Sequence, residues 1–293
     1  MREIVSIFGR NNNLQGILSL NDQSGKPPIE NDTMLVVLNA GTAHKAGPFR
    51  LNVDIARYAA KNNINAFRFD LGGLGDSIKV PSALTHEESV LNDIEDALDF
   101  LEYKYQAKNF IVIGLCTGAV HSHKMALKDE RVIGCIWLDG YGYPTNKFHF
   151  LRYAQVAVDP VRLASSVSKR TIGKLFGSKD KAKMLNGESV DEYIWKLPPI
   201  EQYIDEMNFL KQRDVKCLYI FTGGINEYYN YEAQFTDVFG DYDFMKNVDI
   251  KYIESANHTF VVRRDKQVML NVIGDWLKKI LKVESNTGTA NTD

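Results

Sequence analysis

The sequence predicts an α/β protein with a mostly parallel, doubly wound sheet, and three observations support this fold class. Short apolar runs alternate with segments of helical periodicity along most of the 293 residues. The run at 34–38 is continuously apolar, which is typical of a strand covered by helices on both faces. The alternation breaks between 141 and 213, a stretch too long for a plain connection. We therefore expect a helical insertion there.

Composition and charge favour an ordinary globular protein over a nucleic-acid-binding or membrane-spanning one. The chain is 44% hydrophobic and 25% charged, as in an ordinary globular protein with a core, and its net charge is −2. This balance predicts no nucleic-acid partner. No apolar run approaches the length of a membrane span, and the first residues lack a signal core. Three cysteines without paired spacing argue against a disulfide framework. We expect a cytoplasmic protein without a membrane span.

The expected elements follow in order along the chain. A capping box at Thr85 and Glu88 predicts the start of a long helix, whose apolar stripe recurs at steps of three and four residues. The other expected helices lie at 49–61, 120–128, 200–210, 232–239 and 266–281. The expected strands lie at 4–8, 14–20, 34–38, 66–69, 111–113, 132–138, 217–221 and 248–253.

These elements divide the chain into a core and an insertion. Residues 1–140 and 214–283 form the predicted α/β core, and 141–213 form a helical cap or lid. The tail at 284–293 is polar without apolar periodicity, so we expect it to be disordered. The aromatic side chains of the insertion are candidates either for lining an acyl site or for packing the lid onto the core: Phe148, Phe150, Tyr153 and Trp195.

A Gly-x-Cys-x-Gly motif lies between an expected strand and an expected helix. It comprises Gly114, Cys116 and Gly118. This layout is typical of a nucleophile elbow, in which a sharp strand-to-helix turn holds one reactive side chain exposed. Glycines on both sides allow the strand and the helix to approach closely. The alternative interpretation is a buried structural cysteine, because cysteine is among the most buried residue types.

A histidine follows the last expected strand. His258 lies in the loop 255–260, and groups at the carboxyl ends of strands meet at one edge of an open α/β sheet. An imidazole there can serve a nucleophile as general base, so Cys116 and His258 are expected to act together. The alternative is a solvent-facing loop histidine.

Three segments together resemble the α/β-hydrolase superfamily. The segment 114–118 resembles its nucleophile motif, 67–77 resembles its Asp-x-x-Gly-x-Gly-x-Ser turn, and 257–260 is similar to its histidine loop. The amino-acid sequences of the last two segments also resemble those of the hydrolases associated with exosortase systems. The resemblance spans residues 34–260 and implies an α/β-hydrolase fold with a catalytic triad.

The resemblance also implies the remaining site residues. The family's acid usually follows the strand before the histidine strand, and Glu227 is the first carboxylate there, although the familiar Gly-x-x-Asp wording is absent. Asp139 is the alternative acid. The oxyanion hole would use the amide of Thr117, directly after the nucleophile, and that of Gly41 or Ala40 after the third strand.

Cysteine in place of serine predicts a covalent thioester intermediate. A thiol near a helix N-terminus and a protonated histidine is readily stored as thiolate. The resemblance implies hydrolysis of an ester or thioester, and it includes cysteine-bearing members of the superfamily, the dienelactone hydrolases and polyhydroxyalkanoate synthases, so cysteine at this position is compatible with activity. One alternative is an acyltransferase with the same triad, and another is a non-catalytic binding protein on a hydrolase scaffold. The expected partner is a small-molecule acyl substrate, free or bound to a carrier as a thioester.

No cofactor or metal is expected. The glycines at 72, 73 and 75 lack the spacing of a dinucleotide loop and the lysine of a P-loop. His121 and His123 are two residues apart in an expected helix, so they do not share a face, and no other ligand type clusters with them. Asp70 and Asp76 are expected to make turns by accepting hydrogen bonds from nearby backbone amides.

Overall fold

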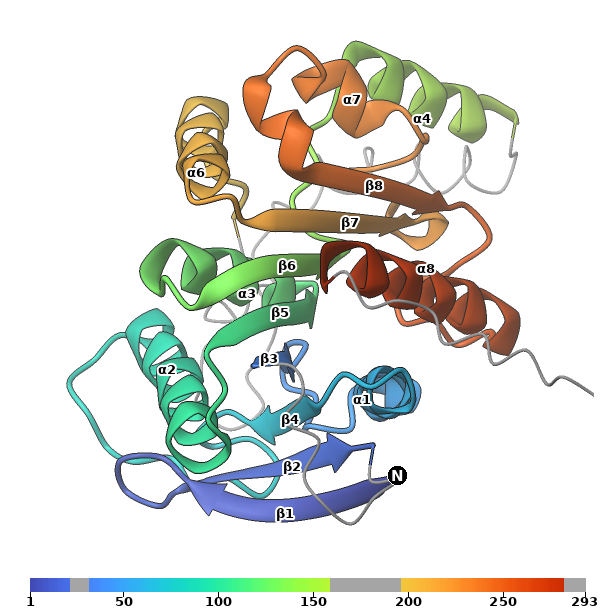
Figure 1. Cartoon of the computed structure of the whole chain (residues 1–293). Helices are drawn as coiled ribbons and strands as arrows, with labels where there is room; N and C mark the ends of the chain where they lie inside the picture. Colours follow the sequence, from blue (N-terminus) through green and yellow to red (C-terminus); the bar gives the residue numbers. More distant parts are fainter. Residues whose placement is uncertain (22–31, 159–195, 282–293) are drawn as a thin grey trace, which may run out of the picture.

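The computed structural model describes residues 1–21, 32–158 and 196–281, and within these ranges it contains one eight-stranded sheet (Figure 1). The strand order is β1-β2-β4-β3-β5-β6-β7-β8. The strands are β1 (Arg2–Phe8), β2 (Leu14–Leu20), β3 (Thr33–Val37), β4 (Ala66–Asp70), β5 (Asn109–Leu115), β6 (Val132–Leu138), β7 (Lys216–Thr222) and β8 (Val248–Ile253). The fold class is the predicted one.

Only β2 runs against its neighbours. It pairs antiparallel with β1 and β4, whereas every later pair is parallel. The carboxyl ends of β3 to β8 therefore meet at one edge of the sheet, and the loops that follow these strands lie together there.

Helices cover both faces of the sheet, as a doubly wound fold requires. The helical elements are η1 (Pro48–Arg50), α1 (Leu51–Lys61), α2 (His86–Tyr105), α3 (Thr117–Lys128), α4 (Asn146–Val158), α6 (Ile200–Gln212), η3 (Gly223–Ile225), α7 (Gln234–Phe239), η4 (Asp243–Asn247) and α8 (Arg263–Leu281). The apolar residues of α1 and α8 pack on one face, and those of α2, α3 and α6 pack on the other (Figure 1).

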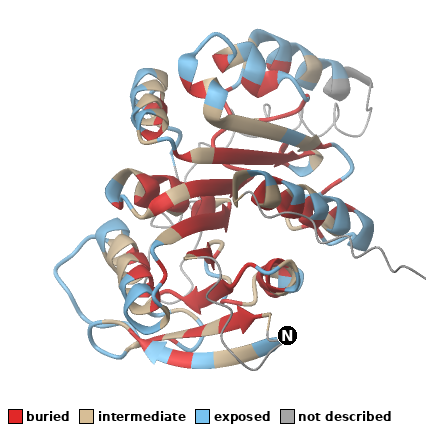
Figure 2. Cartoon of the chain, in the orientation of Figure 1, coloured by how far each residue is buried: buried red, intermediate tan, exposed pale blue. Residues whose placement is uncertain are grey.

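The strand residues alternate between these two apolar clusters. In β3, for example, Leu35 joins the cluster under α1 and α8, and Val36 joins the other. This alternation is the two-residue period of a strand. Every residue of β3 is buried, because helices cover the apolar cluster on each face of the sheet. Figure 2 shows the central strands almost entirely buried.

Most predicted elements occur within a few residues of their expected bounds. The capping box is confirmed: the Thr85 side chain accepts from the Glu88 amide, and Glu88 reaches back to the Thr85 backbone. Helix α3 begins at Thr117, three residues before the expected start, because the turn at the elbow is completed within one residue. Helix α8 begins at Arg263 rather than at residue 266.

The structure separates two parts of the predicted insertion. Tyr203, Met207 and Leu210 of α6 are buried in the same apolar cluster as β6 and β7. Helix α6 therefore lies in the helical layer beside α3 and leads directly into β7 (Figure 1). The cap predicted at 141–213 thus contains, at its end, a helix that packs directly on the sheet.

Helix α4 carries three of the four aromatic residues singled out in the insertion. Phe148 is buried, whereas Phe150 and Tyr153 are largely exposed. Phe148 therefore packs onto the core. Trp195 and the polar tail at 284–293 lie outside the described residues.

Candidate active site

The Gly-x-Cys-x-Gly motif forms a sharp turn between β5 and α3. Cys116 has φ 56° and ψ −115°, a conformation that is strained for a residue with a side chain. A Cβ on Gly114 would lie 2.1 Å from the Gly118 carbonyl carbon, and one on Gly118 would lie 2.5 Å from the Asn39 carbonyl oxygen. Both glycines are therefore required by close contacts of the backbone. The half-buried Cys116 stands at the carboxyl edge of the sheet.

His258 lies at the same edge, in the loop between β8 and α8. Its Nδ1 atom is 2.7 Å from Oδ2 of Asp139. Hydrogen bonds with the Asp139 carboxylate and, second, with the Cys116 side chain raise the pKa of His258 to about 10. Because Nδ1 is taken by Asp139, Nε2 is the ring nitrogen left for the sulfur. The structure thus brings Cys116, His258 and Asp139 together in one chain of contacts.

The raised pKa of His258 has a consequence for stability. The folded protein binds the imidazole proton more tightly than the unfolded chain, whose histidine titrates near pH 6.5. The stabilisation is therefore complete below about pH 6.5 and is lost as pH rises through about 10. At neutral pH the imidazolium form is favoured.

Asp139 is surrounded by hydrogen-bond donors. It is fully buried directly after β6 and has a positive φ of 48°. Its carboxylate accepts from the Thr222 amide at 2.7 Å and from Thr222 Oγ1 at 2.8 Å, in addition to His258. The Tyr228 hydroxyl donates to the Asp139 carbonyl oxygen at 3.1 Å. These contacts hold a strained residue in one orientation, with its carboxylate facing the imidazole.

Glu227, the acid favoured from the sequence, is placed differently. It is exposed after β7, and its backbone carbonyl accepts from Arg152 Nη1 at 3.4 Å. Its carboxylate has no hydrogen-bond partner among residues 1–21, 32–158 and 196–281. The structure therefore brings the alternative acid, Asp139, to His258.

The loop after β7 runs very close to the histidine loop. A Cβ on Gly223 would lie 2.0 Å from the Glu254 carbonyl oxygen, and one on Gly224 would lie 2.4 Å from the His258 amide nitrogen. The loop thus passes the histidine loop at backbone distance, so no side chain fits between them. The Gly223-Gly224 pair was the sequence signal of this close approach.

The three residues expected to form the oxyanion hole lie around the elbow. Ala40 and Gly41 follow β3, and Ala40 packs against the same apolar cluster as Cys116. Thr117 is the first residue of α3, so its amide has no acceptor within the helix. The Gly41 amide donates to Thr117 Oγ1 at 2.7 Å, across 76 residues of sequence. Gly41 has φ +52°, a conformation that favours glycine.

A buried charge cluster anchors the loop that carries Ala40 and Gly41. The Lys45 ammonium contacts Asp70 at 2.6 Å and also binds Asp76, and the Lys45 amide donates to Asp70. Burial alone would lower the pKa of Lys45, but its hydrogen bonds with the two carboxylates outweigh burial and raise it. The loop is therefore fixed at its far end by a paired, buried ammonium.

Sequence reasoning missed most of this cluster. Asp70 accepts from the Asp76 amide at 3.0 Å, as expected of a turn-forming residue, but its main partner is Lys45. Asn39 adds a second link, because its side chain donates to the Ala43 carbonyl at 2.8 Å and accepts from the Leu71 amide at 3.2 Å. A lone lysine in a polar loop gave no signal that the fold would bury it.

The described residues contain no group of three or more His, Cys, Asp or Glu side chains arranged to hold a metal ion. Instead, His123 Nε2 lies 2.8 Å from Oε2 of Glu206, and burial lowers the pKa of His121 to about 4. In the same parts of the chain no helix is both long and apolar enough to span a bilayer.

Comparisons with known proteins identify the fold. No protein-family model matches the sequence, and no curated protein matches it. Solved structures, in contrast, match the chain over most of its length. The chain is similar to the esterase Pf2001 of Pyrococcus furiosus, with a TM-score of 0.60 and 12% identity over 95% of this chain and 91% of that one.

Two further solved structures agree with this likeness. Alpha/beta hydrolase domain-containing protein 10 from mouse has a TM-score of 0.53 and 16% identity over 94% of this chain and 99% of that one. XC6422 of Xanthomonas campestris, described as an α/β serine hydrolase without a lid, has a TM-score of 0.54 and 11% identity over 97% and 96%. The protein therefore has the α/β-hydrolase fold.

Proposed function

We propose that the protein is a cysteine-dependent hydrolase that cleaves an ester or thioester through a covalent acyl-enzyme. Cys116 is the nucleophile, His258 the general acid and base, and Asp139 the residue that orients the imidazole. The observation that carries the proposal is the position of His258, which contacts both the Cys116 side chain and the buried Asp139 carboxylate. The similar solved structures, an esterase and an α/β serine hydrolase among them, support hydrolysis.

Acylation begins with the Cys116 thiolate beside the protonated imidazole of His258. The sulfur attacks the carbonyl carbon of the substrate and forms a tetrahedral intermediate with a negatively charged oxygen. The Thr117 amide, at the start of α3, is a donor for that oxygen. When the intermediate collapses, the imidazolium gives its proton to the departing alcohol or thiol, and the acyl group stays on sulfur as a thioester.

Deacylation uses the same residues in reverse. The now neutral imidazole takes a proton from water, and the resulting hydroxide attacks the thioester carbonyl. The second tetrahedral intermediate expels the Cys116 thiolate, the acid product leaves, and His258 retains the proton. The thiolate and imidazolium of the starting state are thereby restored.

Asp139 takes the place of Glu227 in this proposal. Its carboxylate accepts a hydrogen bond at Nδ1 of His258 and so fixes the tautomer whose Nε2 faces the sulfur. Two hydrogen bonds from Thr222 hold the carboxylate so that it points at the imidazole.

Intact-protein mass spectrometry with a panel of acyl thioesters and p-nitrophenyl esters tests the proposal. We expect the wild type to gain the mass of the acyl group and to release the leaving group, and Cys116→Ala to do neither. Cys135→Ala is the matched control, because it removes a fully buried thiol from the neighbouring strand β6. Turnover by Cys116→Ala at the wild-type rate would reject the nucleophile.

A further inference from the structure

The side chain of Thr117 occupies an unusual position beside the predicted nucleophile. Its hydroxyl oxygen accepts the Gly41 amide hydrogen at 2.7 Å. Thr117 opens α3 directly after Cys116, whereas Gly41 belongs to the loop after β3. The hydroxyl thus lies between the two backbone segments expected to supply donors to an oxyanion, and it already holds the amide of one of them.

The hydroxyl of Thr117 retains an unused proton. A threonine hydroxyl accepts through its lone pairs and donates one hydrogen. The Gly41 amide uses an acceptor position, but the described parts of the chain place no acceptor within hydrogen-bond distance of this hydroxyl. Thr117 is only 7% exposed, and a nearly buried donor without an acceptor is costly. Such a donor is suited to a bound ligand that supplies an oxygen.

The surroundings of Gly41 leave room for that oxygen. A Cβ built on Gly41 would meet no atom of residues 1–21, 32–158 and 196–281 within 4 Å, so these parts of the chain leave the space beside it open. The loop itself is held by Lys45, whose amide and ammonium both bind the buried Asp70. An anchored loop keeps the Gly41 amide on the Thr117 oxygen while a substrate enters.

We propose that the Thr117 hydroxyl donates a hydrogen bond to the oxyanion of the tetrahedral intermediate, with the Gly41 amide behind it. This inference rests on the proposed function and adds a side-chain donor to its oxyanion hole. The chain runs from the Gly41 N–H to the Thr117 oxygen and from the Thr117 O–H to the substrate oxygen. No proton is transferred along it. Each hydrogen bond polarises the next, and the substrate oxygen receives both the amide and the hydroxyl of Thr117.

The competing interpretation gives the opposite result in an experiment. If the Gly41 amide itself must reach the oxyanion, the Thr117 oxygen occupies the place of the substrate oxygen and has to move away. Removing the hydroxyl would then leave acylation unchanged or make it faster. If the hydroxyl is a donor, removing it slows acylation.

Single-turnover acylation of Thr117→Val and Thr117→Ser, measured with a p-nitrophenyl ester, tests the inference. Valine matches the size of threonine but has no donor, and we expect about a 100-fold slower acylation, the effect typical of losing one oxyanion donor. Thr117→Ser keeps the hydroxyl and should stay within several-fold of the wild type. Substrate affinity should change little, because the bond forms in the transition state.

Alkylation of Cys116 by iodoacetamide is the matched control reaction. Displacement of iodide develops no oxyanion, so its rate should be the same in the wild type and both variants. A Thr117→Val enzyme that is acylated as fast as the wild type would overturn the inference and leave the proposed function standing, and an equal loss in alkylation would assign the effect to the thiolate instead. A wild type that is never acylated would reject the proposed function, and the inference with it.

Discussion

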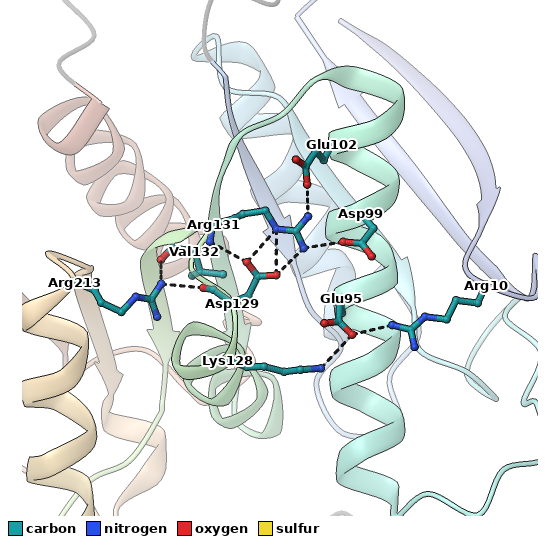
Figure 3. A network of polar contacts seen from close by, with 9 residues as sticks. All are labelled: Arg10, Glu95, Asp99, Glu102, Lys128, Asp129, Arg131, Val132 and Arg213. Atoms are coloured by element: carbon teal, nitrogen blue, oxygen red, sulfur yellow. Dashed lines mark hydrogen bonds and ion pairs between the residues drawn. The ribbon is translucent and has the colours of Figure 1, made fainter.

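The two ends of the sheet both hold clusters of charged residues, but the clusters differ in burial. At the amino end, Arg131 contacts Asp129 together with Asp99 and Glu102, whose side chains are 58% and 52% exposed (Figure 3). At the carboxyl end, the carboxylates of Asp139 and Asp70 are fully buried. Water therefore screens Asp99 and Glu102, although Asp129 beside them is nearly buried, and it does not reach the carboxylates of Asp139 and Asp70.

Exposed and buried charges therefore have different effects on the protein. Exposed ion pairs contribute little because water and salt weaken them and because long side chains lose entropy when they are held. A buried carboxylate has to be matched by donors, and once matched it keeps one orientation. The polar groups that need a fixed geometry are therefore expected at the carboxyl end. Substitutions at the two ends test this expectation.

The largest expected effect follows from Asp139→Asn. The amide cannot accept from all three donors now facing the carboxylate, and it no longer favours the imidazole tautomer that faces Cys116. A loss of up to about 10⁴-fold in kcat is expected, as for other triads that lose the orienting acid. Glu227→Gln removes an exposed carboxylate and should change kcat by less than about 2-fold. Steady-state kinetics on both variants measure this, and the opposite ranking would restore Glu227 as the acid.

A smaller effect, on stability, follows from breaking the buried pair of Lys45 and Asp70. Asp70→Asn leaves the Lys45 ammonium with Asp76 alone, and Lys45→Met leaves the buried Asp70 carboxylate with backbone donors alone, so each change is expected to cost up to about 3–5 kcal/mol. We expect Asp70→Asn and Lys45→Met each to lower the free energy of urea-induced unfolding by an amount in this range. The double variant removes both charges and should be less destabilised than the sum of the two. Strict additivity would mean that the pair is not energetically coupled.

The sequence predicted the sheet and the position of the elbow because both depend on local patterns. The apolar run at 34–38 and the glycines around Cys116 each report a constraint within a few neighbouring residues. The partner of His258 depended instead on which carboxylate the folded sheet brings to the histidine loop, and that contact joins segments 119 residues apart. For the same reason the bonds from Lys45 to Asp70 and from Gly41 to Thr117 were not predicted.

The smallest expected effect is at the amino end. Arg213 there donates to the backbone carbonyls of Asp129 and Val132, between α3 and β6, and Glu95 binds both Arg10 and Lys128 (Figure 3). Asp99→Asn removes one of the carboxylates around Arg131 but leaves Asp129 in place.

We expect Asp99→Asn to change the free energy of unfolding by less than about 0.5 kcal/mol and to leave kcat unaltered. Repeating the urea titration in high salt should reduce even this difference, because exposed charges are screened. A loss of several kcal/mol that persists in high salt would contradict the comparison, since burial would then no longer distinguish the two clusters. A change in kcat without a change in stability would mean that the amino end is coupled to the site through α3, the helix that begins at Thr117 and ends beside Asp129.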